Sequence, residues 1–191
     1  MINAPGSMQT VATAARSLLD DGLVVVSVYL KWDSISCKTK VVPAVRGWQC
    51  FNVERARPSL TENANAVAIV TGAKSGVIVV DVDLPGLEQW HEVTQKYGLP
   101  TVPRVRTGSG GLHYYFSWHL SVQAGLKSTG NQVTLVLPDV GRVAVDVRAE
   151  GGCALCPPSK GFAKDGSESL YTWESPLATQ NPCNFHTHIP C

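Results

Sequence analysis

Two aspartates at the end of a β-branched run are the residues best suited to chemistry. Residues 76–83, with the sequence GVIVVDVD, are typical of a strand buried on both faces. Asp81 and Asp83 therefore share a face, about 7 Å apart along the strand. Carboxylates this close repel each other, and such hard oxygen ligands select Mg²⁺ or Mn²⁺. The doublet predicts a divalent-cation site; the alternative is two solvated acids where the strand enters the turn at Leu84.

A glycine-rich loop forms a second group. Residues 107–111, TGSGG, precede a β-rich run that includes His113. Glycines let a loop approach a ligand closely and present backbone N–H groups to an anion. The ring of His113 could then hydrogen-bond a phosphate oxygen, although a hairpin turn followed by a packed histidine explains the same residues. The spacing matches neither the P-loop nor the dinucleotide fingerprint.

A third acid ends another β-branched run further along the chain. Asp146 follows residues 143–145, and Arg148 shares its face two positions later. The pair could be a structural salt bridge. Alternatively, Asp146 is a third carboxylate for the cation site of Asp81 and Asp83, and Arg148 binds a polyphosphate through two hydrogen bonds.

Hydrophobic periodicity predicts few helices and many strands. Helices are expected at residues 8–21 and 87–97, a polar loop at 31–40, and an irregular or weakly helical segment at 51–65. Strands are expected at 23–30, 66–70, 76–83, 102–106, 112–116, 133–137, 143–147, 153–156 and 171–173. This pattern predicts an α+β domain with a mixed or antiparallel sheet flanked by helices.

Five motifs follow one another along the chain. They are TG and SGVIVVDVD within 71–83, TGSGGLHYYF at 107–116, DVRAEGG at 146–152, PPS at 157–159 and YTW at 171–173. In this order they resemble the bifunctional primase–polymerase (prim-pol) domain of the archaeo-eukaryotic primase superfamily, over about residues 12–173. The resemblance implies a two-layer catalytic core with an RNA-recognition-motif-like sheet. We expect a catalytic domain at 8–175 and an irregular tail containing Cys and His at 176–191.

The resemblance also implies an activity, a DNA-templated nucleotidyl transfer that initiates replication. Asp81, Asp83 and Asp146 would be catalytic and would hold two Mg²⁺ or Mn²⁺ ions. The nucleotide-binding residues would be His113 at the triphosphate, with Ser109, Gly110, Gly111, Arg148 and Lys40. The expected partners are nucleoside triphosphates, a single-stranded DNA template, a primer and a separate helicase.

Composition excludes several other classes of protein. The net charge of +1 gives no whole-molecule attraction to nucleic acid, so any such contact must be local. No stretch reaches the roughly 18 apolar residues that cross a bilayer, and residues 1–16 lack a secretory signal. Six cysteines in 191 residues do not form a disulfide-rich scaffold, so we expect an intracellular protein without membrane contact.

The tail contains four possible zinc ligands, Cys183, His186, His188 and Cys191. Cys153 and Cys156 supply two more within an expected strand. The spacing matches no zinc module, so we expect an irregular tail and ordinary burial of the Cys153 and Cys156 thiols.

Two other functions fit the same residues. A non-catalytic module could keep the fold and bind nucleotides or nucleic acid. A metal-dependent phosphodiesterase could use the same three acids on a plain nucleic-acid substrate.

Overall fold

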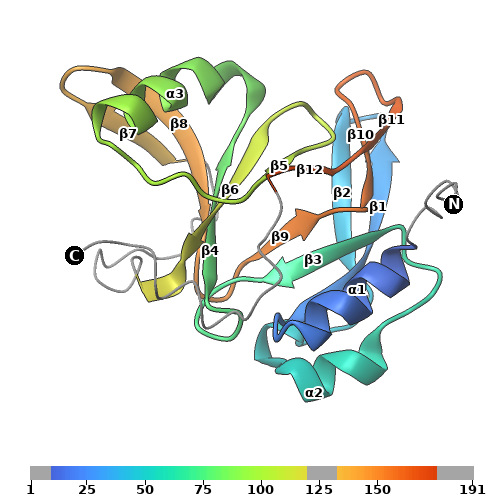
Figure 1. Ribbon diagram of the computed structural model, residues 1–191. Coiled ribbons are helices and arrows are strands. Elements are labelled where there is room, and N and C mark those ends of the chain that lie inside the picture. Colours follow the sequence, from blue (N-terminus) through green and yellow to red (C-terminus); the bar gives the residue numbers. More distant parts are fainter. Residues whose placement is uncertain (1–9, 120–132, 176–191) are drawn as a thin grey trace, which may run out of the picture.

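Two antiparallel sheets lie at the centre of the fold and carry helices on their outer sides (Figure 1). The computed structural model describes residues 10–119 and 133–175. The larger sheet consists, in spatial order, of β12 (Thr172–Ser175), β5 (Arg104–Arg106), β6 (Leu112–Ser117), β4 (Val77–Val82), β8 (Gly141–Arg148) and β7 (Val133–Leu137). The smaller sheet consists of β2 (Lys38–Pro43), β1 (Val25–Asp33), β3 (Ala66–Val70) and β9 (Cys153–Cys156).

The remaining elements are short or lie on the outside. A two-stranded ribbon of β10 (Lys160–Phe162) and β11 (Glu168–Leu170) contacts β1. The α-helices are α1 (Val11–Asp20), α2 (Val53–Ala56) and α3 (Leu87–Lys96), and three short 3₁₀ helices are η1 (Trp48–Cys50), η2 (Arg57–Ser59) and η3 (Leu84–Gly86). All strand pairs within the described ranges are antiparallel, which confirms the predicted α+β class and the sheet flanked by helices.

Alternation along β4 gives the larger sheet two different faces. Ile78, Val80 and Val82 pack against α3 and against apolar residues of β8. Val77 and Val79 point the other way, into a second core shared with the smaller sheet and α1. All five valine and isoleucine side chains are buried, which confirms a strand covered on both faces. Because Asp81 follows Val77 and Val79 in the alternation, it lies on the face toward the smaller sheet.

Helix α1 covers the outer side of the smaller sheet (Figure 1). It begins after Thr10, whose side chain accepts a hydrogen bond from the backbone N–H of Thr13. Such a cap stabilises a helix by about 1 kcal/mol. Ala15 and Leu19 then enter the core beside β1 and β3. The helices expected at 8–21 and 87–97 correspond to α1 and α3.

Residues 31–40 form most of a hairpin, not the expected loop. Strand β1 continues to Asp33 and β2 begins at Lys38. Asp33 closes the turn by accepting hydrogen bonds from the Ile35 N–H and the Ser36 hydroxyl. The polar composition of this segment does not predict a strand, because the strand is stabilised by a contact distant in the chain. Trp32 packs on the Phe162 ring of β10, with 6.0 Å between the ring centroids. Strands β10 and β11 were not expected from the sequence either.

The buried hydroxyl of Ser159 ties β3 to the turn after β9. It accepts a hydrogen bond from Val67 N at 2.9 Å and donates one to Cys156 O at 2.6 Å. Ser159→Ala leaves the Val67 N–H without its partner, so we expect the free energy of unfolding to fall by about 1–3 kcal/mol. Urea denaturation measures this loss. Ser34→Ala, at an exposed serine, is the control and should change stability by less than about 0.5 kcal/mol; equal effects would contradict the assigned role.

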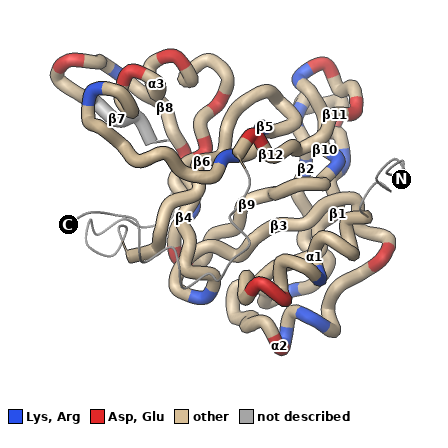
Figure 2. Tube along the Cα trace, viewed as in Figure 1, with Lys and Arg blue, Asp and Glu red and all other residues tan. Residues whose placement is uncertain are grey.

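Charges of both signs are mixed over the molecule. Lys and Arg positions are interspersed with Asp and Glu along the chain (Figure 2). No helix in residues 10–119 or 133–175 is long and apolar enough to cross a membrane. With a net charge of +1, electrostatic binding of a ligand depends on local groups.

Candidate active site

Three side chains on neighbouring strands of the larger sheet form a row. Asp81 of β4 pairs with His113 of β6 on one side and with Asp146 of β8 on the other. Directly opposed residues share a face, and their Cβ atoms lie about 4.5–5.5 Å apart. Asp83 follows β4 two positions beyond Asp81. The fold thus brings together the acids and the histidine that the sequence placed in one site.

A pocket of about 850 Å³ lies in front of this row. The larger sheet and its glycine loop contribute Asp81, Asp83, Ser109, His113, Asp146 and Arg148 to the lining. Strand β9, the β1–β2 hairpin, the segment around β10 and Tyr171 contribute the rest. The charged row is therefore accessible to a ligand, but it is enclosed by elements of both sheets.

His113 is held in one orientation by a backbone carbonyl. Its side chain is only 7% exposed, and its Nδ1 lies 3.1 Å from the carbonyl oxygen of Leu155. Because a carbonyl only accepts hydrogen bonds, Nδ1 carries a proton and donates it. Nε2 therefore faces the acids, 3.5 Å from Oδ1 of Asp81. A ring fixed in this way can donate from Nε2 to an anion when it is protonated.

The two central acids have carboxyl pKa values shifted in opposite directions. Burial raises the pKa of Asp81, but His113, by hydrogen bond and charge, and then Arg148 outweigh it, so the pKa lies below its ordinary value. Burial raises the pKa of Asp146 above its ordinary value. Arg148 opposes this second shift, whereas the charges of Asp81 and Asp83 add to it. The ionised form of Asp146 is therefore disfavoured, and a cation beside this carboxylate would stabilise it.

Arg148 lies among the carboxylates as an internal cation. Its guanidinium is 2.6 Å from Oδ2 of Asp146 and 3.8 Å from Oδ2 of Asp81. The salt bridge that the sequence allowed between Asp146 and Arg148 is present, and both side chains also line the pocket. The roles of Asp146 at a cation and of Arg148 at a polyphosphate stay predictions.

The acids fit a cation in their chemistry but are not arranged as a ligand set in this structure. Within the described ranges, no three His, Cys, Asp or Glu side chains are grouped closely enough to hold a metal ion. Oδ1 of Asp146 is nevertheless buried without a hydrogen-bond partner. Buried carboxylate oxygens normally have a partner. This orphaned oxygen is the observation that favours a cation at the site.

A comparison with protein families identifies the chain. The family described as bifunctional DNA primase/polymerase, N-terminal (Prim-Pol), matches residues 31–184, well over half of the 191 residues. The chain belongs to the Prim-Pol family. Membership confirms the resemblance and implies a primase/polymerase type of nucleotidyltransferase in general. A search among curated proteins found no match.

The glycine loop of this Prim-Pol domain packs tightly against the end of β4. A Cβ at Gly111 would lie 2.6 Å from Val82 O and 3.3 Å from the Cα of Asp83. Gly110 has a positive φ of 90° and donates to Thr107 O, which closes the turn. Ser109 reaches the pocket, whereas Gly110 and Gly111 are not among the residues that line it. The glycines thus fix the loop beside Asp83, and Ser109 carries its polar side chain into the site.

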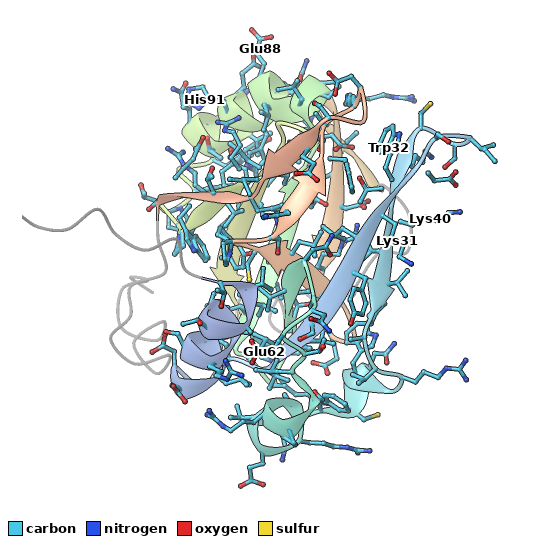
Figure 3. The ribbon with its side chains drawn as sticks, turned by 90° about the vertical axis from the view of Figure 1, so that its right-hand side faces the viewer. Lys31, Trp32, Lys40, Glu62, Glu88 and His91 are labelled. Carbon is cyan, nitrogen blue, oxygen red and sulfur yellow. The ribbon has the colours of Figure 1, made fainter. Side chains whose placement is uncertain are left out.

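Lys40 lies outside the lining of this pocket. Its ammonium forms a 2.8 Å ion pair with Asp33, and it is paired across the hairpin with Lys31. Figure 3 shows Lys31 and Lys40 extending outward from the β1–β2 hairpin. Lys38 of the same strand does line the pocket. The binding of a nucleotide by Lys40 stays a prediction, which its absence from the pocket lining does not favour.

The ion pair between Lys40 and Asp33 can be tested by titrating the Asp33 carboxyl group. The hydrogen bond from Lys40 is the main cause that lowers the pKa of Asp33 from 3.8 to about 2, so the pair contributes stability above pH 3.8 that is lost as pH falls through 2. We expect Lys40→Ala to raise the pKa of Asp33 toward 3.8 in an NMR titration of the carboxyl carbon. Lys31→Ala, in the same hairpin, should leave it near 2. A pKa unchanged in Lys40→Ala would contradict the pairing.

The cysteines of β9 behave as buried thiols. Cys156 is fully buried and Cys153 is half-buried. Burial raises the pKa of Cys153 to about 11 and that of Cys156 still further. The possible zinc ligands of the tail, Cys183, His186, His188 and Cys191, lie outside the described residues.

Among the pocket-lining residues that sequence reasoning missed are Trp32, Lys38, Phe162 and Lys164. They come from the two hairpins that were not expected. The signal that could have revealed the β1–β2 hairpin is the alternation within residues 28–33, where the apolar Leu30 and Trp32 alternate with the polar Lys31 and Asp33.

Proposed function

We propose that this Prim-Pol chain extends a primer on a single-stranded DNA template and also starts new strands, using nucleoside triphosphates. The observation that carries the proposal is the row of Asp81, His113 and Asp146 across three adjacent strands, facing one pocket. If β6 or β8 were paired with β4 one residue out of this register, the side chain of His113 or Asp146 would point to the opposite face of the sheet.

The three acids are the residues that would hold two Mg²⁺ or Mn²⁺ ions. Bound ions would lower the pKa of the attacking 3′-hydroxyl and neutralise charge on the triphosphate and the leaving pyrophosphate. The support is the orphaned Oδ1 of Asp146 and the oxygen-only chemistry of Asp81, Asp83 and Asp146, which suits these ions.

The other polar residues would bind and orient the triphosphate. His113, with Nδ1 fixed on Leu155 O, directs Nε2 to a phosphate oxygen. Arg148 can exchange its contact with Asp146 for the triphosphate, because a guanidinium binds carboxylate and phosphate oxygens with the same geometry. Ser109 offers its hydroxyl from the glycine loop. In phosphoryl chemistry of this kind, positioning and charge neutralisation supply most of the rate enhancement.

A primer-extension assay tests the proposal. A labelled primer annealed to a longer template is incubated with the full chain, deoxynucleoside or ribonucleoside triphosphates, and Mn²⁺ or Mg²⁺; an unprimed template tests strand initiation. We expect template-dependent products that disappear with excess EDTA. The absence of products under every combination of ion and triphosphate would overturn the proposal.

A second candidate function is nucleotide binding without catalysis. The Asp146–Arg148 contact favours it, because a third carboxylate that stays paired with Arg148 is not available to an ion. This candidate predicts that a triphosphate binds without being incorporated.

A further inference from the structure

We call Asp81, His113 and Asp146 the acidic row. The pocket has a second wall, whose chemistry differs from that of this row. We call Trp32, Lys38, Phe162 and Lys164 the aromatic wall; all four line the pocket and none belongs to the larger sheet. Trp32 is the last residue but one of β1, Lys38 begins β2, and the other two lie at the end of β10 and in the turn that follows it. The acidic row therefore shares one pocket with two aromatic residues and two lysines from outside the larger sheet.

The two rings of the aromatic wall are held in place but remain partly exposed. The centroids of Trp32 and Phe162 are 6.0 Å apart, with the planes tilted by 41°. A Cβ at Gly166 would lie 2.8 Å from the indole nitrogen of Trp32, so the β10–β11 turn rests directly against the indole. Tyr115, in contrast, is fully buried in the core against Trp173. Trp32 and Phe162 thus offer ring surface to the pocket at little further cost in side-chain entropy.

The two lysines of the aromatic wall carry charge that is available to a ligand. Lys38 and Lys164 are exposed, and neither forms an ion pair with a residue in 10–119 or 133–175. Lys40, two residues from Lys38, is instead neutralised by Asp33. Cations beside partly exposed rings are the combination that binds single strands, since the cations contact phosphates and the rings stack on bases.

We propose that the aromatic wall binds the single-stranded template, with a base stacked on Trp32 and Phe162 and phosphates beside Lys38 and Lys164. The inference rests on the proposed function, which already assigns the triphosphate to the acidic row. A pocket of about 850 Å³ lies near the upper end of the roughly 300–1,000 Å³ typical of sites for one small ligand. It therefore leaves room for a templating base opposite the incoming nucleotide.

The test measures binding of a fluorescein-labelled oligodeoxynucleotide by fluorescence anisotropy, in EDTA and without triphosphate. Removal of a stacking ring weakens binding by roughly 5- to 100-fold, so we expect a loss of this size in Trp32→Leu. Trp32→Phe keeps a ring and should lose less than about threefold. Phe162→Leu provides a second variant, and thermal unfolding of each variant shows whether the β10–β11 hairpin has kept its packing.

The lysines have a signature of their own in the salt dependence. Each phosphate contact contributes about 0.7 to the slope of log affinity against log salt for a single strand. We expect Lys38→Ala and Lys164→Ala each to reduce the slope by about this amount, whereas Trp32→Leu should leave it unchanged. Lys31→Ala removes the same charge next to Trp32, but Lys31 does not line the pocket, so this variant should leave both affinity and slope unchanged.

A parallel measurement separates this proposal from the proposed function. Binding of a fluorescent nucleoside triphosphate with Mn²⁺ should be lost in Asp81→Asn and retained in Trp32→Leu. Binding of the oligonucleotide should be retained in Asp81→Asn and weakened in Trp32→Leu. Wild-type oligonucleotide binding in folded Trp32→Leu and Phe162→Leu would overturn the proposal and leave the acidic row intact. Loss of triphosphate binding alone in Trp32→Leu would also overturn it, because the wall would then hold the incoming base.

Discussion

Replacing Asp81 with asparagine is expected to slow nucleotide incorporation by on the order of a thousand-fold, the loss of the several kcal/mol that a metal ion contributes to a transition state. Asp81 is the middle residue of the row, between His113 and Asp146. Asparagine keeps the shape of the side chain and removes the charge that both an ion and His113 require. Single-turnover primer extension with Mn²⁺ measures the loss. Asp83→Asn and Asp146→Asn should show losses of the same order.

An acid outside the site provides the control for this result. Asp20 ends α1, is exposed, and forms an ion pair with Arg57 at 2.7 Å. Exposed pairs contribute about 0–1 kcal/mol to stability, so Asp20→Asn should fold and extend primers as the wild type does. Unchanged incorporation in Asp81→Asn, with the same protein concentration and ion, would remove the acidic row from the mechanism.

The substitution Gly111→Ala is expected to reduce incorporation by about 100-fold through misplacement of groups in the site. The added Cβ would meet Val82 O at 2.6 Å and the Cα of Asp83 at 3.3 Å. Both are backbone atoms, so either the glycine loop or the end of β4 must shift. The shift moves Ser109 and Asp83 apart without removing any polar group. Incorporation is measured by primer extension, and circular dichroism confirms that the sheets are retained.

Gly108→Ala in the same loop is the matched control. Its Cβ would press on the Ser169 hydroxyl, a side-chain atom without a hydrogen-bond partner that can rotate away. We expect a loss of less than about tenfold, because no backbone atom of the site has to move. Equal losses in both variants would show that the loop is sensitive as a whole and that the contact between Gly111 and β4 has no special role.

The acidic row could be predicted because its determinants are local. Two β-branched runs, 77–80 and 143–145, each lead to an aspartate, and alternation fixes which side chains share a face. The order of motifs then implied that the strands are neighbours, and the antiparallel pairings of β4 with β6 and β8 agree with this. The glycine loop was recognised from composition alone. Its close packing against Val82 depends on the path of the backbone, which composition does not contain.

The aromatic wall could not be predicted because its determinants are distant in the chain. Trp32 owes its position to Phe162 and Gly166, which belong to a ribbon formed far downstream. Without that ribbon, residues 31–40 have the composition of a solvated loop. Similarly, Lys38 and Lys40 are equivalent in sequence, and the Asp33 ion pair distinguishes them only once the hairpin has formed.

A crystal structure with Mn²⁺ and a non-hydrolysable nucleoside triphosphate tests directly whether the three acids form the catalytic cation site. We expect anomalous scattering peaks for Mn²⁺ in contact with Asp81, Asp83 and Asp146. We also expect the triphosphate beside His113, with Arg148 turned from Asp146 to the phosphates. A bound triphosphate that leaves the Asp146–Arg148 pair closed, with no Mn²⁺ peak at the acids, would contradict a cation site formed by the three acids.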